Sequence, residues 1–227
     1  MQYPQYGSKE LMNNWCNTDK YFASKKWEEN RELKALRPTF KIFKRFRYVD
    51  WSPKIAEVGM GNGIHSKYLY DELKPSHLYL HDLNDPEREP AISLLKKDNV
   101  TFLKGDSLET IKQLPDDMDI IYLDGCHEFY HVLKEIVLAW PKLKVGGILG
   151  GHDYEHMGVM AAVQTLNINL WASTPKHFLH DMKIDYCSDD HPGYPHEYNE
   201  QHLPLEWSII KYDSHPKELN LKLLRNG

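Results

Sequence analysis

Short apolar runs alternate along the chain with longer segments in which apolar residues recur every three or four positions. The short runs, rich in Ile, Val, Leu and Tyr, predict buried strands, and the three-and-four spacing predicts helices. The expected strands cover 55–58, 77–82, 100–104, 119–124, 148–151, 182–187 and 205–212. The expected helices of this part of the chain cover 64–73, 83–97, 108–114, 128–143 and 158–166. Such alternation predicts an α/β fold, with a doubly wound, mostly parallel, seven-stranded sheet and helices on both faces.

The turn after the first expected strand is rich in glycine. Gly59, Gly61 and Gly63 occupy alternate positions between that strand and the helix that begins near Ile64. Glycine reaches backbone conformations closed to other residues and allows a ligand to approach the main chain. A helix N-terminus behind such a turn is suited to bind a nucleotide. The segment therefore resembles the nucleotide-binding start of an α/β sheet.

Acidic residues follow the other expected strands. Asp82, Asp106, Asp124 and Asp153 each stand at or just beyond a strand end. Because the carboxyl ends of parallel strands meet at one edge of a sheet, we expect these residues to face a common ligand. Asp82 lies 19 residues beyond Gly63, close to the spacing of about 20 at which an acid accepts hydrogen bonds from a ribose. Asp106 has two readings, ligand contact or cap of the following helix.

Composition and charge narrow the function classes. The net charge of −5 and pI of about 6.2 make a nucleic-acid surface unlikely, although Lys41, Lys44, Arg45 and Arg47 form a basic patch on an expected helix. Three cysteines without metal-site spacing favour reduced thiols and a cytoplasmic protein. No apolar run is long enough to span a membrane. We expect a protein without a membrane partner.

Two further segments of the chain are candidates for substrate contact. Residues 1–47 read as an N-terminal helical arm with many aromatic residues, either packed on the main domain or acting as a lid. Residues 48–227 would form the main domain. Within it, the segment near 171–204 is rich in His, Tyr, Pro and Gly and would form a substrate loop.

The ordered series of motifs resembles the class I S-adenosylmethionine-dependent methyltransferases. The series comprises Glu57-x-Gly59-x-Gly61-x-Gly63, Asp82, Gly105-Asp106-Ser107 and Tyr122-Leu123-Asp124-Gly125-Cys126-His127. The stretches 140–147 and 151–154 are similar to the small-molecule O-methyltransferases that include macrocin-type sugar enzymes. The resemblance covers about residues 50–170 and the last expected strand, and it implies a Rossmann-like methyltransferase sheet.

The resemblance also implies a cofactor site for S-adenosyl-L-methionine. The glycines would line the methionine and ribose portion, Glu57 would support their turn, Asp82 would bind the ribose, and Asp106 and Ser107 would flank the adenine. The implied cofactor residues are Glu57, Gly59, Gly61, Gly63, Asp82, Asp106, Ser107 and Asp124.

Methyl transfer to a hydroxyl needs a group that removes or weakens its proton. Metal-dependent relatives hold a divalent cation at the positions of Asp124, His152 and Asp153. The histidine makes this set less suited to Mg²⁺ than to Mn²⁺, Fe²⁺ or Zn²⁺. In a second reading no metal takes part and His152 or His127 acts as general base. In a third, His152 is a strand-end residue without chemistry.

The function expected from these features is methyl transfer to a hydroxyl of a small metabolite, such as a sugar or nucleotide sugar. The alternatives are N-methylation of a small molecule, an NAD(P)-binding oxidoreductase, a non-catalytic binding module and a nucleic-acid methyltransferase. A nicotinamide fingerprint would require Gly or Ala where Ile64 stands, which disfavours the oxidoreductase. A homo-oligomer is a further expectation, through the N-terminal arm.

Overall fold

The computed structural model describes residues 52–61, 63–84, 95, 97–154, 156–173, 183–186 and 205–219. The expected arm 1–47, nearly all of the expected helix 83–97 and most of the expected loop 171–204 lie outside these residues. In the described part of the chain, no helix is both long and apolar enough to cross a membrane.

One mostly parallel sheet forms the centre of the molecule, as the sequence predicts. Its strands are β1 (Lys54–Val58), β2 (His77–Asp82), β3 (Val100–Lys104), β4 (Met118–Leu123), β5 (Leu143–Gly151), β6 (Lys183–Tyr186) and β7 (Leu205–Ile210). They lie in the order β3-β2-β1-β4-β5-β7-β6. The pairs from β3 to β5 are parallel, whereas β7 is antiparallel to both β5 and β6. The strand order reverses between β1 and β4, which is where doubly wound sheets bind ligands.

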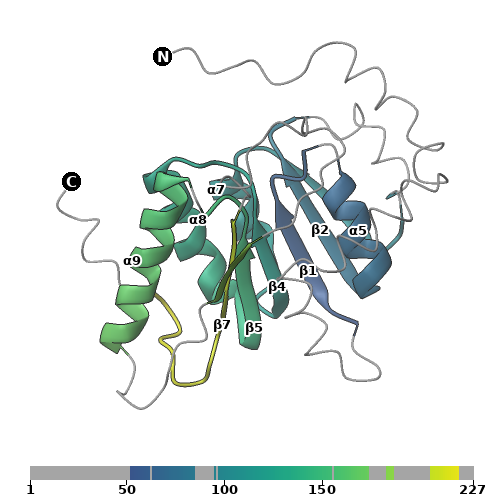
Figure 1. Cartoon of the computed structure of the whole chain (residues 1–227). Coiled ribbons are helices and arrows are strands. Elements are labelled where there is room, and N and C mark those ends of the chain that lie inside the picture. Colours follow the sequence, from purple (N-terminus) through teal and green to yellow (C-terminus); the bar gives the residue numbers. More distant parts are fainter. Residues whose placement is uncertain are drawn as a thin grey trace, which may run out of the picture.

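Helices cover both faces of the sheet (Figure 1). The described helices are α5 (Ile64–Leu73), α7 (Ser107–Thr110), the 3-10 turn η2 (Ile111–Gln113), α8 (Phe129–Lys142) and α9 (Met157–Ser173). Helix α5 lies on one face, and α8 and α9 lie together on the other. The doubly wound architecture is therefore confirmed.

Alternating strand residues supply the two cores. Ile55, Ile120 and Ile148 are buried in the cluster on the α5 side. Their chain neighbours Ala56 and Leu149, among others, are buried in the cluster that α8 and α9 cover. A strand buried on both faces reads as a continuous apolar run, which is why these strands were visible in the sequence.

Strand β5 begins earlier than the expected 148–151. It starts at Leu143, directly after α8, and its pairing with β4 is irregular between Met118 and Ile120. Gly146, at φ +82°, accommodates this irregularity. Lys211 donates from Nζ to the carbonyls of Trp140 and Leu143, each at 2.8 Å. A buried lysine thus satisfies the carbonyls at the end of α8.

The strand register brings the predicted site residues to one edge. Val58 pairs with His81 of β2 and with Leu123 of β4. Leu123 in turn pairs with Gly151 of β5. The residues that follow these strands, which carry the glycine turn and the acids, therefore lie side by side at the carboxyl edge of the sheet.

Candidate functional site

A pocket of about 420 Å³ lies over the carboxyl ends of β1 to β4. Its size falls in the range usual for small-molecule sites. Six of the residues expected to bind a cofactor line it: Gly59, Gly61, Asp82, Asp106, Ser107 and Asp124. The other two expected residues, Glu57 and Gly63, do not line it. Because the pocket spans the ends of β1 and β4, it lies at the topological switch point that the strand order defines.

The glycine turn is shaped by tight backbone contacts. The amides of Gly59 and Met60 both donate to the carbonyl of His81, at 2.9 and 3.0 Å. Gly59 has a φ of +89°, and a Cβ there would lie 2.2 Å from the carbonyl oxygen of Asp124. Only glycine fits this crossing of two main chains. Gly61, at φ +51°, has open space around the corresponding position.

Asp82 stabilises the glycine turn and also lines the pocket. Its Oδ2 accepts a hydrogen bond from the Gly61 amide at 3.0 Å, and its Oδ1 accepts one from the Asn84 amide at 2.8 Å. A carboxylate oxygen can accept more than one hydrogen bond. Asp82 therefore remains able to accept from a ligand while it fixes the loop.

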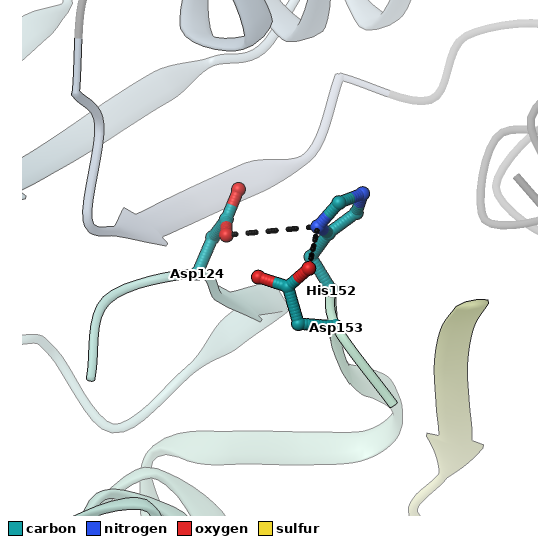
Figure 2. Close-up of side chains that lie close together, drawn as sticks. All are labelled: Asp124, His152 and Asp153. Atoms are coloured by element: carbon teal, nitrogen blue, oxygen red, sulfur yellow. Dashed lines mark ion pairs between the residues drawn. The ribbon is translucent and has the colours of Figure 1, made fainter. Parts of the chain in front are cut away.

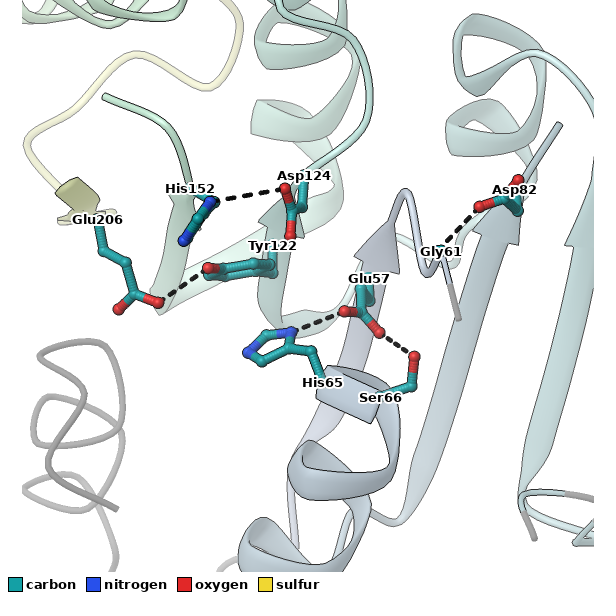
Figure 3. A network of polar contacts seen from close by, with 9 residues as sticks. All are labelled: Glu57, Gly61, His65, Ser66, Asp82, Tyr122, Asp124, His152 and Glu206. Carbon is teal, nitrogen blue, oxygen red and sulfur yellow. Dashed lines mark hydrogen bonds and ion pairs between the residues drawn. The ribbon is translucent and has the colours of Figure 1, made fainter. Parts of the chain in front are cut away.

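Glu57 lies under the turn and not in the pocket. It is buried, and it accepts hydrogen bonds from Ser66 and, at 2.7 Å, from Nδ1 of His65, both at the start of α5 (Figure 3). Gly63, at φ +77°, precedes that helix. These contacts agree with a supporting role for Glu57, whereas Gly63 lies at the start of α5 and not among the residues that line the pocket.

Asp106 caps α7, which is one of the two roles that the sequence suggests for it. Its Oδ1 accepts from the Leu108 amide at 2.8 Å, and the residue also lines the pocket. Its neighbour Ser107 contacts His131 of α8, with 2.8 Å between Oγ and Nε2. The loop after β3 is thus tied to α8.

Two buried residues that we did not predict from sequence also line the pocket. Glu135 of α8 is 1% exposed, and neither carboxylate oxygen has a partner in hydrogen-bond geometry. Burial raises its pKa, against the opposing effects of the nearby Ser107 side chain and of His131. His81 is also 1% exposed, and its Nδ1 lies 2.8 Å from Oγ1 of Thr110. Burial lowers the pKa of His81 to about 4, so the ring is neutral at pH 7.

A cluster of acids and imidazoles lies at the ends of β4 and β5, and Figure 2 shows three of its residues, Asp124, His152 and Asp153. His152 Nδ1 is 3.0 Å from Asp153 Oδ1 and 3.9 Å from Asp124 Oδ1. The other carboxylate oxygen of Asp153 is 2.7 Å from His127 Nε2. The structure thus brings together all four predicted catalytic residues, with Asp153 between two histidines.

Asp153 is held in an unusual conformation. Its φ of +55° is uncommon for a residue other than glycine, although aspartate tolerates it better than most. Burial alone would raise the pKa of Asp153, but the contacts with His127 and His152 outweigh burial and hold it well below its usual range. The Asp153 contact raises the pKa of His127, against the opposing effect of burial. Asp153 is therefore ionised at neutral pH.

A close backbone contact fixes the position of His127. Gly158, in the first turn of α9, lies so near that a Cβ there would be 2.0 Å from the His127 carbonyl oxygen. No side chain fits between α9 and this loop. The ring of His127 also stacks on His156, with 5.2 Å between the ring centroids.

A row of buried polar side chains lies beside this cluster (Figure 3). The Tyr122 hydroxyl donates to Glu206 of β7 at 3.0 Å, and the Tyr122 ring packs on His65, 4.6 Å between centroids. Tyr122 and Glu206 are each no more than 1% exposed. The row connects β7, β4 and α5 beneath the carboxyl edge.

The donor set of Asp124, His152 and Asp153 fits a divalent cation. One ligand atom from each residue lies within 4.8 Å of the others. An imidazole and two carboxylates suit Mn²⁺, Fe²⁺ or Zn²⁺ better than Mg²⁺. The same contacts also suit a histidine oriented by a carboxylate, so the geometry accommodates both chemical readings.

A signal for one of the missed residues was present in the sequence. Glu135 falls among Val132, Leu133, Ile136 and Ala139, on the buried stripe of an apolar helix. An acid at a core position of such a helix is unusual without a partner or a function. His81 gave a weaker signal, because histidine is common at partly buried strand positions.

Residues 56–154 match a family described as "Methyltransferase domain". This match joins the glycine turn, Asp82, Asp106, Asp124 and Asp153 in a single domain. Residues 56–154 are therefore similar to S-adenosylmethionine-dependent methyltransferase domains.

Comparisons with other proteins point in the same direction. The chain is 38% identical over 85 residues to a malonyl-[acyl-carrier protein] O-methyltransferase of Bacteroides thetaiotaomicron, a match that covers 34% of this chain and 32% of that protein. Solved structures with the same fold include an rRNA methylase from Streptococcus thermophilus, at 16% identity and a TM-score of 0.53, covering 72% of this chain and 89% of the other. Precorrin-6y C5,15-methyltransferase from Geobacter metallireducens is similar at 17% identity and a TM-score of 0.52, covering 74% and 85%. At these identities the solved structures establish the fold alone.

Proposed function

We propose that this methyltransferase transfers the methyl group of S-adenosylmethionine to a hydroxyl of a small metabolite, such as a sugar or nucleotide sugar. The observation that carries the proposal is the cluster of Asp124, His127, His152 and Asp153 beside the cofactor pocket. An amine is nucleophilic once neutral, and a carboxylate needs no base. A hydroxyl needs help to lose its proton, and this cluster supplies groups that can take it.

In the metal-free route, His152 is the general base. Its Nδ1 faces Asp153, so the neutral ring carries its proton on that nitrogen and the lone pair on Nε2. His127, held by the other oxygen of Asp153, keeps that carboxylate oriented. The hydroxyl proton passes to Nε2 as the oxygen attacks the methyl carbon in line with the departing sulfur.

In the metal route, Asp124, His152 and Asp153 would hold a divalent cation, which would acidify and orient the acceptor hydroxyl. His127 would then orient Asp153 as a ligand. The pocket residues Asp82, Asp106 and Ser107 bind the cofactor in both routes.

The similarity to a malonyl-[acyl-carrier protein] O-methyltransferase supports oxygen as the acceptor atom. A carboxylate acceptor is less favoured here, because Asp124 and Asp153 would place negative charge beside it. The proposal includes a cytoplasmic setting and a small-molecule partner. Nucleic acid and membrane surfaces are not part of it, and homo-oligomer formation remains an expectation.

Calorimetric titration with S-adenosylmethionine and S-adenosylhomocysteine tests the cofactor, with micromolar binding expected. Methyl transfer to a panel of sugars, nucleotide sugars, amines and carboxylic acids then tests the acceptor, in EDTA and with added Mn²⁺. We expect hydroxylated acceptors to react, and a response to EDTA would select the metal route. Absence of cofactor binding, or transfer to amines alone, would contradict the proposal.

A further inference from the structure

Glu135 is the one described acid that both lines the cofactor pocket and lacks a hydrogen-bond partner on either carboxylate oxygen. It lies directly behind the loop after β4, since a Cβ on Gly125 would be 3.7 Å from Glu135 Oε1. Gly125 also lines the pocket, and its lack of a side chain leaves the carboxyl facing the ligand space. A buried polar group without a partner is costly unless a ligand satisfies it.

Two polar neighbours, Ser107 and His131, lie near Glu135, but neither carboxylate oxygen has a partner in hydrogen-bond geometry. Ser107 lies close enough to lower the pKa of Glu135 against the larger, opposite effect of burial. His131 Nε2 is 3.4 Å from Glu135 Oε1 and 2.8 Å from Ser107 Oγ. A ring nitrogen carries either one hydrogen or one lone pair and so makes one hydrogen bond. The closer Ser107 hydroxyl makes that bond with Nε2 of His131, and Glu135 is left without it. Because Ser107 and Glu135 approach the same nitrogen, the three residues do not form a nucleophilic triad, in which the acid would hold the opposite nitrogen.

We propose that Glu135, as a neutral carboxylic acid, recognises the adenine of the cofactor through the exocyclic amine N6 and the ring nitrogen N7. A neutral carboxyl presents one acceptor and one donor side by side. The side-chain amide of Asn or Gln has the same pattern and pairs with adenine in this way. The position fits, because Glu135 and Ser107 both approach Nε2 of His131. The methyltransferase resemblance places the adenine beside Asp106 and Ser107, at this end of the pocket. The assignment rests on the proposed function.

The surroundings of Glu135 favour its neutral form. Its burial removes water from the carboxylate, and such removal favours protonation. The titratable groups that face it are His131 on the same helix, Asp106 before α7 and His127 before α8. Asp106 adds negative charge, and the two histidines act in the opposite direction. An ionised Glu135 would offer acceptors only and would repel the ring nitrogen.

The test compares Glu135→Gln with Glu135→Leu, using S-adenosylhomocysteine and S-inosylhomocysteine, in which an oxygen replaces the exocyclic amine. The wild-type protein should bind the adenine compound at least about 10-fold more tightly, and Glu135→Gln should keep that preference. Glu135→Leu should lose roughly 10- to 100-fold in affinity for the adenine compound and little for the other. A merely structural role would weaken both ligands alike.

A second measurement does not depend on the folding of Glu135→Leu. Wild-type affinity for S-adenosylhomocysteine should weaken as pH rises and Glu135 ionises, whereas the affinity of Glu135→Gln should change less. Equal pH profiles, or a Leu variant with unchanged affinity and preference, would overturn the assignment alone. A wild-type protein that binds neither compound would overturn the proposed function and this assignment with it.

Discussion

The two halves of the carboxyl edge are built differently. Around the pocket over β1 to β4, main-chain turns form the shape, and the polar groups of Asp82, Glu135 and His81 keep capacity for a ligand. At the ends of β4 and β5, the side chains of His127, Asp153 and His152 contact one another. The first arrangement is suited to binding and the second to moving a proton. Substitutions in the two halves should therefore affect different measurements.

The largest expected effect lies in the cluster at β4 and β5. Asp153→Asn keeps a residue that tolerates the positive φ but removes the charge that orients both histidines. Methyl transfer should fall roughly 100- to 10,000-fold, whereas the Kd for S-adenosylhomocysteine should change little. Steady-state kinetics and calorimetry measure the two quantities. Asp116→Asn, at an exposed acid far from the cluster, is the matched control, and normal turnover by Asp153→Asn would show that the site is misassigned.

The next effect lies in the glycine turn. Gly59→Ala would force a Cβ against the Asp124 carbonyl, 2.2 Å away, so the free energy of unfolding should drop by about 3 kcal/mol or more. Gly61→Ala has open space and should lose only about 1–2 kcal/mol through its positive φ. Urea denaturation of both variants gives the comparison. Equal losses would mean that the crossing of the two main chains is looser than the structure shows.

His81 predicts a pH-dependent stability. Burial lowers its pKa to about 4 from an ordinary value of 6.5, so the unfolded chain binds the proton more tightly. The stabilisation is complete above pH 6.5 and is lost as pH falls toward 4, by roughly 3 kcal/mol. His81→Gln keeps a hydrogen-bonding group without this titration. Its free energy of unfolding, measured by denaturant titration at several pH values, should fall less than that of the wild type, and parallel curves would contradict the shift.

A smaller effect is expected at Asp82. Asp82→Ala should weaken S-adenosylhomocysteine binding roughly 10- to 100-fold, because it removes the charged acceptor and loosens the Gly61 loop. Calorimetric titration measures the change, with the exposed Asp98→Ala as control. Unchanged affinity in Asp82→Ala would separate this acid from the ligand and weaken the contrast between the two halves.

Residues on regular elements were the most predictable from the sequence. The apolar runs around Ile55 and Ile120 identified strands because both faces of those strands are buried, and the parallel sheet then placed Asp82 and Asp124 at one edge. The contacts among His127, His152 and Asp153 were not predictable in detail, because they depend on loop conformations such as the positive φ of Asp153. Glu135 differs again. Its place on the apolar stripe of α8 can be read in the sequence, but its proposed role depends on the lack of a hydrogen-bond partner, which a sequence does not reveal.

The contact of Gly158 with the His127 carbonyl has a consequence for how this domain could change over time. Main-chain atoms, not side chains, set the distance between α9 and the loop that carries His127. Most neighbouring side chains can be substituted without moving His127. The surrounding sequence could therefore change to accept new substrates while the cluster of His127, His152 and Asp153 stays in place. Position 158 itself has no such freedom, and among divergent copies of this domain it should vary less than the exposed Met157 beside it.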